Sequence, residues 1–185
     1  MDNEQTGHRK GNSTEPLVEI QSILKALNIL PGQTVLDVGC GNGYMAKEFS
    51  RLVTETGKVH GLDRSPQAIE TLEKETQDTN ICPIEADITQ RTALQAASVD
   101  LIYLSTVFHV FSEEQKDGFV REANRLLKPK GKLALVEIEK KDTPFGPPRS
   151  KRVSPAEMQQ SISMKWLSLT RVGEHFYMQV FEKNE

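Results

Sequence analysis

Residues 35–44, VLDVGCGNGY, decide the fold of this chain. An apolar, strand-like run containing one acid leads into glycines at three alternate positions, Gly39, Gly41 and Gly43. Glycine lets the backbone turn tightly and approach a ligand, because a Cβ atom would collide or forbid the required dihedral angles. The next residues, 44–53, have helical spacing, so the loop leads to a helix N-terminus with unpaired amides. The stretch predicts a nucleotide-type site at the carboxyl end of the first strand of an α/β sheet.

The spacing of the glycines limits which kind of nucleotide the predicted site could bind. A dinucleotide-binding fingerprint has the form G-x-G-x-x-G, but Tyr44 occupies its last position here. The phosphate-binding pattern G-x-x-x-x-G-K-[ST] does not occur in the chain. What is left is an acid, Asp37, two residues before a G-x-G-x-G turn. A glycine loop alone is a weak signal, and a purely structural turn is the alternative, so the remaining motifs have to decide.

Length and composition are those of one globular domain. The chain has 185 residues and a net charge of −3, so it can bury a core and has no overall attraction for nucleic acid or an anionic membrane. Residues 1–14 are polar and are expected to be a disordered tail before a single domain, 15–185. No signal peptide or membrane-spanning run is recognisable. Cys40 and Cys82 form neither a disulfide framework nor a zinc site, so we expect a reduced, cytoplasmic protein without a bound metal.

Strand and helix patterns alternate along the chain, which favours a parallel sheet flanked by helices. The expected helices are 16–28, 44–54, 65–77, a weak one at 91–97, 112–127, and one that starts at Ser154. The expected strands are 35–38, 58–62, 81–85, 99–104, 132–138, 165–171 and 176–181. Gly173 separates the last two strands, so we expect them to form an antiparallel hairpin.

Acids also end the second and third expected strands. Asp63, followed by Arg64, closes the run VHGLD. A carboxylate at such a strand tip can accept hydrogen bonds from both ribose hydroxyls of a nucleotide, as in other doubly wound folds. Capping of the helix that begins at Ser65 is its alternative role. The third strand ends in EADI, which places Asp87 and Ile88 at the neighbouring tip.

Taken in order, these motifs resemble those of the class I S-adenosylmethionine-dependent methyltransferases. The match includes the acid and glycine loop, VHGLD, EADI, the strand VDLIYLS and the turn LLKPKG, and it spans roughly residues 31–137. The resemblance implies a Rossmann-like α/β fold with a mostly parallel seven-stranded sheet, a C-terminal antiparallel hairpin and helices on both faces. It also implies S-adenosylmethionine as the cofactor.

The resemblance assigns roles along the cofactor. The glycine-loop amides and the positive end of the following helix suit the methionine carboxylate, and Asp37 orients that loop or meets the amino group through water. Asp87 would accept from the adenine amine while Ile88 packs on the ring. The complete set of expected contacts is Asp37, Gly39, Cys40, Gly41, Gly43, Tyr44, Asp63, Arg64, Asp87, Ile88, Ser105 and Thr106, the last two beside the methionine.

A narrower group is also similar, namely the small methyltransferases related to ubiquinone/menaquinone C-methyltransferases and arsenite methyltransferases. The segment KKDTPFGPPRSKRVSPAEMQQ and the hairpin after it carry this resemblance. Arsenite enzymes use several cysteines as ligands, whereas this chain has two, so arsenic chemistry is not expected. The family often has a longer N-terminal segment over the substrate, and the sequence before Pro16 is short and polar.

Three features after the cofactor motifs suggest how an acceptor is handled. His109 follows the fourth strand and titrates near neutrality, so it is the candidate general base, with a packing histidine as the alternative. Glu137, near the end of the fifth strand, is a second group that could face the pocket. The basic loop 140–152 could recognise an anionic acceptor through Arg149 and Arg152, with a solvated loop as the alternative.

The functional hypothesis is methyl transfer from S-adenosylmethionine to a small-molecule acceptor by a monomer or homodimer. A protein or RNA methyltransferase is the first alternative, disfavoured by the acidic charge balance. A non-catalytic S-adenosylmethionine-binding partner subunit is the second, and a nicotinamide-dependent oxidoreductase is a weaker third.

Overall fold

The computed structural model describes residues 18–184, so the expected tail and the start of the first expected helix lie outside the described residues. One seven-stranded sheet has the order β3-β2-β1-β4-β5-β7-β6. Its strands are β1 (Thr34–Val38), β2 (Lys58–Asp63), β3 (Ile81–Glu85), β4 (Val99–Ser105), β5 (Leu127–Ile138), β6 (Lys165–Arg171) and β7 (Phe176–Glu182). β1 to β5 pair in parallel, and β7 lies antiparallel between β5 and β6. The sequence prediction of a mostly parallel sheet with a C-terminal hairpin is confirmed.

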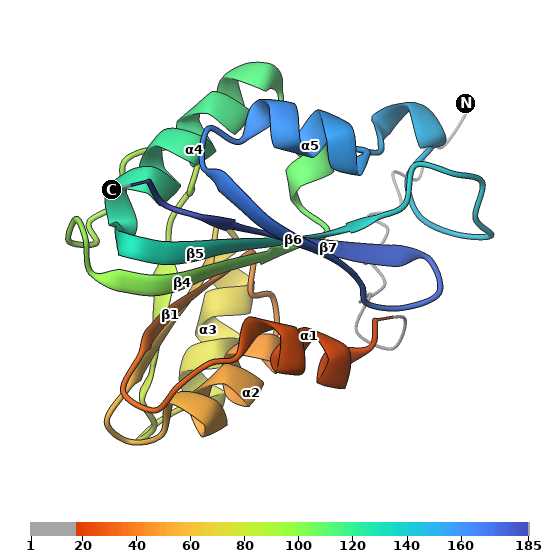
Figure 1. The fold of residues 1–185 in the computed structure, drawn as a ribbon. Coiled ribbons are helices and arrows are strands. Elements are labelled where there is room, and N and C mark those ends of the chain that lie inside the picture. The colour runs from red at the N-terminus through yellow and green to blue at the C-terminus, as the bar shows by residue number, and fades with distance from the viewer. Residues whose placement is uncertain (1–17, 185) are drawn as a thin grey trace, which may run out of the picture.

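Helices cover both faces of this sheet (Figure 1). On one face lie α1 (Ile20–Leu27), α2 (Tyr44–Val53) and α3 (Pro66–Glu75), and on the other lie α4 (Glu113–Leu126) and α5 (Pro155–Ser161). Two short 3₁₀ helices, η2 (Phe108–Val110) and η3 (Arg149–Lys151), occupy connections on the same side as the carboxyl ends of β4 and β5. The chain order reverses between β1 and β4, and the carboxyl ends of parallel strands at such a point form the usual ligand-binding crevice.

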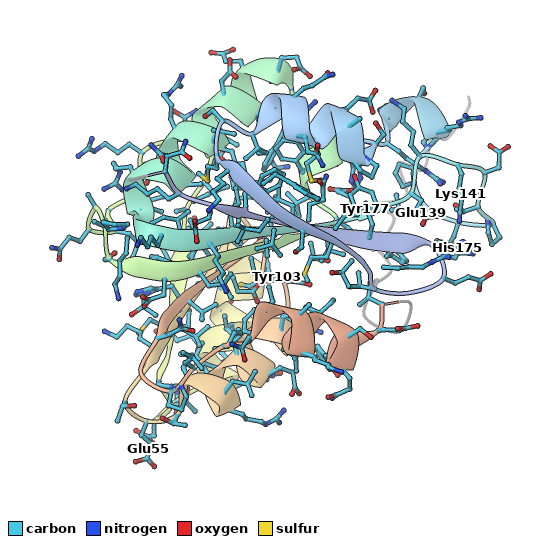
Figure 2. The ribbon with its side chains drawn as sticks, viewed as in Figure 1. Glu55, Tyr103, Glu139, Lys141, His175 and Tyr177 are labelled. Atoms are coloured by element: carbon cyan, nitrogen blue, oxygen red, sulfur yellow. The ribbon has the colours of Figure 1, made fainter. Side chains whose placement is uncertain are left out.

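Successive side chains of β4 point to opposite faces of the sheet and pack in two different hydrophobic layers. Ile102 and Leu104 join the layer under α4 and α5, whereas Leu101 and Tyr103 join the layer over α1 and α2. Figure 2 shows Tyr103 on the α1 side of the sheet, where its ring meets the edge of Phe49 at a centroid distance of 5.2 Å. Tyr103 is therefore a core residue.

The expected helix at 91–97 is wrong, because no helix forms in that segment. Thr92 instead donates from its backbone N and its hydroxyl to Glu122 Oε1 of α4, at 2.8 and 2.7 Å. Ala97 has a φ of 51°, which a helix cannot contain. A contact with a residue far along the chain thus overrides a local helical preference.

The fifth strand is longer than expected. β5 begins at Leu127 rather than near Lys132, and it runs through the proline–glycine turn. Val99 pairs with Leu127 and Leu101 pairs with Lys132, so the register shifts between these two pairs. The turn residues are accommodated as an irregularity of the ladder and do not interrupt it.

Candidate cofactor and active site

The glycine loop joins β1 to α2 with a backbone that only glycine adopts easily. Gly39, Gly41 and Gly43 have φ values of 68°, 52° and 74°. A Cβ on Gly43 would lie 2.2 Å from Leu72 Cδ1, and one on Gly39 would lie 2.9 Å from Val107 Cγ2. By contrast, a Cβ on Gly41 would have no neighbour within 4 Å. Two of the glycines are required by close packing, and the third faces open space where a ligand can approach the backbone.

The carboxylate of Asp63 holds the loop in place. Its Oδ2 accepts from Gly41 N at 3.0 Å, and its Oδ1 accepts from Ser65 N at 2.9 Å. The backbone adds to this link, because the amides of Gly39 and Cys40 both donate to Leu62 O, at 2.7 and 3.1 Å. The strand tip of β2, the glycine loop and the start of α3 are therefore one hydrogen-bonded unit.

Asp87 and Ile88 are fixed by the loop that follows β3. Asp87 Oδ1 accepts from the backbone N and the hydroxyl of Thr89, at 2.8 and 2.7 Å. Helix α4 presses on this loop at Gly118, where a Cβ would lie 2.2 Å from Thr89 O. Ile88 is 4% exposed and belongs to the core layer under α4. The loop is thus held by two contacts, one between Ile88 and the hydrophobic core and one between Thr89 and α4.

One cavity of about 190 Å³ unites these elements. Five residues expected at the cofactor line it, namely Gly39, Asp63, Arg64, Asp87 and Ile88. The rest of its wall is formed by Val38, Leu62, Ala86, Val107, Val110, Phe111 and Gln115. Two carboxylates at strand tips and an apolar wall are suited to a nucleoside, whose ribose is polar and whose base is flat and largely apolar. Nothing in the sequence motifs identified the segment from Val107 to Gln115.

The other expected cofactor contacts do not line that cavity. They occur nearby in the chain, at the end of β1 and in its loop (Asp37, Cys40, Gly41, Gly43, Tyr44) and at the end of β4 (Ser105, Thr106). Asp37 is 3% exposed. Burial, with help from the negative charges of Asp37 and Asp63, raises the pKa of the Cys40 thiol. Cys40 therefore stays protonated and is a packing residue rather than a nucleophile.

The comparison with known families decides the family to which this fold belongs. The family described as "Methyltransferase domain" matches residues 35–131, which is more than half of the chain. This chain is a class I S-adenosylmethionine-dependent methyltransferase by family. The matched region runs from the start of the glycine loop to the turn within β5 and includes every wall of the cavity.

Relatives of this methyltransferase domain support the same assignment. A demethylmenaquinone methyltransferase of Oceanobacillus iheyensis is 29% identical over 114 residues, covering 62% of this chain and 48% of that protein. A probable cobalt-precorrin-6B C(15)-methyltransferase of Thermoplasma acidophilum is 41% identical over 97 residues, covering 51% and 40%. The chain spans about half, or less, of the length of the curated relatives it matches.

The fold of the methyltransferase domain is also found in solved structures. That of an S-adenosylmethionine-dependent methyltransferase from Aquifex aeolicus superposes with a TM-score of 0.81 at 24% identity, covering 92% of this chain and 93% of that one. The likeness extends over the C-terminal hairpin as well as the parallel strands. It confirms the Rossmann-like methyltransferase fold that the motifs implied.

Beyond the cavity, the methyltransferase domain places His109 beside Glu137. His109 lies in η2 and its Nδ1 is 2.8 Å from Glu137 Oε2, a carboxylate with no exposed surface. Tyr177 is also buried, and its hydroxyl donates to Val153 O at 2.6 Å, so it holds the start of the α5 segment against the sheet. This contact gives Tyr177 a structural role.

The interpretation of Arg152 as an anion receptor is wrong. The side chain is buried, and its guanidinium donates to four backbone carbonyls of its own loop. Those acceptors are Pro147 O at 2.8 Å, Glu139 O at 3.1 Å, Lys141 O at 2.6 Å and Phe145 O at 3.0 Å. Figure 2 shows Glu139, Lys141 and His175 at the same end of the sheet. Arg152 organises this loop, whereas Arg149 is exposed and stays a candidate for contact with an anion.

Replacing Arg152 should loosen the loop without touching the cofactor cavity. We expect Arg152→Lys to lower the free energy of unfolding by about 1–3 kcal/mol, because a single ammonium leaves several of the four carbonyls without the donor that they have in the wild type. Urea denaturation measures the change. The matched control is Arg149→Lys, an exposed site in the same loop, where we expect no change. Equal stability of the two variants would contradict the role given to Arg152.

No helix within residues 18–184 is long and apolar enough to cross a bilayer. In the same residues, no group of three or more His, Cys, Asp or Glu side chains is arranged to hold a metal ion.

Proposed function

We propose that this protein transfers a methyl group from S-adenosylmethionine to a small-molecule acceptor. The observation that carries the proposal is the cavity that joins Gly39 to Asp63 and Asp87 at the carboxyl ends of β1, β2 and β3, in a chain of the methyltransferase family. The residues present fit the cofactor, because the space beside Gly41 is open and two carboxylates are available to hydroxyl and amine donors.

In this proposal the cofactor extends across the sheet from β3 to β4. Asp87 accepts from the adenine amine, Ile88 packs on the ring, and Asp63 accepts from the ribose hydroxyls. The N-terminus of α2 binds the methionine carboxylate, since the amides of Gly39, Cys40 and Gly41 already donate to Leu62 O and Asp63. Ser105 and Thr106 lie beside the methionine. When bound, S-adenosylmethionine supplies an electrophilic methyl group. The protein contributes chiefly by holding the acceptor in line with that methyl, which can lower the barrier by roughly 7–11 kcal/mol.

Membership of the family does not identify the acceptor, so its chemical class is part of what we propose. Relatives named for demethylmenaquinone and cobalt-precorrin suggest a cyclic organic acceptor. The net charge of −3 disfavours a nucleic acid. Both cysteines are free, which supports a reduced, cytoplasmic setting for the reaction. The domain over residues 15–185 would act as a monomer or homodimer.

An acceptor screen tests the proposal. The protein is incubated with S-adenosylmethionine and a panel that includes hydroquinones, catechols and tetrapyrroles, and release of S-adenosylhomocysteine is measured. Bulk tRNA and a protein extract are the comparison substrates. We expect turnover on one small-molecule class. Transfer of label only to RNA or to protein would contradict the small-molecule assignment, and binding without any transfer would favour the partner-subunit alternative.

A further inference from the structure

His109 and Glu137 form an isolated pair at the tips of two neighbouring strands. Glu137 is the penultimate residue of β5, and His109 follows β4 in η2. The carboxylate contacts the histidine twice: Oε2 lies 2.8 Å from Nδ1, and Oε1 accepts from the backbone N of His109 at 3.2 Å. Two contacts from one carboxylate fix both the position of the residue and the direction of its ring.

The surroundings of Glu137 require this partner. The carboxylate has no exposed surface, and no Lys or Arg within residues 18–184 forms an ion pair with it. Tyr177 of β7 pairs with Glu137 in the sheet, but its hydroxyl donates to Val153 O and not to the carboxylate. Since a buried carboxylate is costly unless it accepts hydrogen bonds, the ring N–H of His109 satisfies it. The proton of the neutral imidazole therefore resides on Nδ1.

The opposite nitrogen of the ring is available for chemistry. In the described part of the chain, Nε2 of His109 has no hydrogen-bond partner, and the side chain keeps 11% of its surface exposed. Val107, two residues before His109, and Val110, the residue after it, line the proposed cofactor cavity. The adenine end of that cavity lies at β2 and β3, so His109 lies toward the opposite, β4–β5 end, where the methionine and the acceptor are placed by the proposed function.

We propose that Nε2 of His109 is the general base for an acceptor that carries an ionisable hydroxyl, a phenol or an enol, and that Glu137 is the positioning residue that keeps the proton on Nδ1. This inference rests on the proposed function. The acceptor O–H bond breaks and its proton passes to Nε2. The oxygen forms a bond to the methyl carbon as the carbon–sulfur bond breaks, with its electron pair left on sulfur. The histidine then loses the proton to water.

A general base raises the rate of methyl transfer and does not change the affinity for the cofactor. A general base contributes typically 10²–10⁴-fold, so His109→Gln should lower kcat for a hydroxyl acceptor by about that factor. The affinity for S-adenosylmethionine should not change, because His109 is not among the residues that line the cavity.

The direct test is the tautomer of His109, read by two-bond ¹H–¹⁵N NMR on the full-length protein at neutral pH. His109→Gln assigns the signal among the four histidines. We expect the pattern of a ring protonated at Nδ1 in the wild type. Glu137→Gln should populate the other tautomer, because the amide carries no charge to hold the proton at Nδ1. Glu139→Gln removes a partly exposed carboxylate two residues farther along the chain, which pairs with Lys141 and not with His109; it is the matched control and should leave the signal unchanged.

The outcomes separate this inference from the proposed function. A wild-type ring protonated at Nε2 would overturn it, since it would mean that Glu137 donates a proton and that no base faces the acceptor. An unchanged pattern in Glu137→Gln would overturn the positioning role. Calorimetry with S-adenosylmethionine on the same samples decides the other question. Failure to bind the cofactor overturns the proposed function, while binding with the wrong tautomer overturns the inference alone.

Discussion

Asp63→Ala should weaken the binding of S-adenosylmethionine by roughly 100-fold or more. In the proposed site the carboxylate accepts two hydrogen bonds from the ribose, and bonds to charged groups contribute about 1.5–3 kcal/mol each, where 1.4 kcal/mol is tenfold in affinity. The substitution also releases Gly41 N and Ser65 N, which the carboxylate holds in the free protein. The lost ribose bonds and the released amides both weaken cofactor binding. The second does so because the glycine loop would have to become ordered when the cofactor binds.

The control for this variant lies on the neighbouring strand. Glu85 pairs with Asp63 in the sheet register, but it is exposed and does not line the cavity. We expect Glu85→Ala to bind S-adenosylmethionine as the wild type does. Isothermal titration calorimetry measures both variants, and circular dichroism checks that Asp63→Ala is folded. Equal affinities for the two variants would contradict a contact between Asp63 and the cofactor.

Glu122→Ala should cause the largest loss of stability among the variants discussed. The carboxylate is 5% exposed and accepts from Arg125 Nη2 at 2.6 Å as well as from the backbone and hydroxyl of Thr92. Its removal leaves the half-buried guanidinium of Arg125 and the buried amide of Thr92 without their acceptor, at a cost of about 1–3 kcal/mol for each donor left unsatisfied. Glu114→Ala, an exposed site on the same helix, should change stability by less than about 0.5 kcal/mol.

The same carboxylate predicts a dependence on pH. Burial alone would raise the pKa of Glu122, but the hydrogen bonds from Arg125 and Thr92 outweigh it and lower the pKa below its ordinary value. A carboxyl whose pKa is lower in the folded state stabilises the protein above its unfolded pKa, about 4.3 for Glu, and loses that contribution as the pH falls through the folded pKa. The difference in unfolding free energy between wild type and Glu122→Ala should therefore shrink below about pH 4.3. A constant difference would contradict an ionised Glu122.

Local patterns predicted the parts of this molecule that depend on neighbours in the chain. The glycine loop, the acid at the tip of β2 and the alternation of helices with strands all have signals within a few residues. The mostly parallel seven-stranded sheet with its C-terminal hairpin came from the resemblance to a family. The strand order β3-β2-β1-β4-β5-β7-β6 was not predicted, because nothing in the periodicity of single strands says which of them pair.

Contacts between distant residues were beyond the sequence. Glu122 draws Thr92 out of a helix-like segment, and Arg152 turns inward onto carbonyls although it stands in a run of basic residues. Four residues of the cavity wall also escaped notice, because they belong to no motif: Val107, Val110, Phe111 and Gln115. Counts of charge cannot distinguish a buried guanidinium from a solvated one, and only packing supplies that information.

The measurement that tests the central claim most directly is calorimetric titration of the wild-type protein with S-adenosylmethionine, with NAD and ATP as comparison ligands. The glycine spacing with Tyr44 at the last position of the dinucleotide fingerprint, and the two carboxylates of the cavity, predict micromolar binding of S-adenosylmethionine and no comparable binding of NAD or ATP. Preference for NAD, or no binding of S-adenosylmethionine at all, would contradict the account.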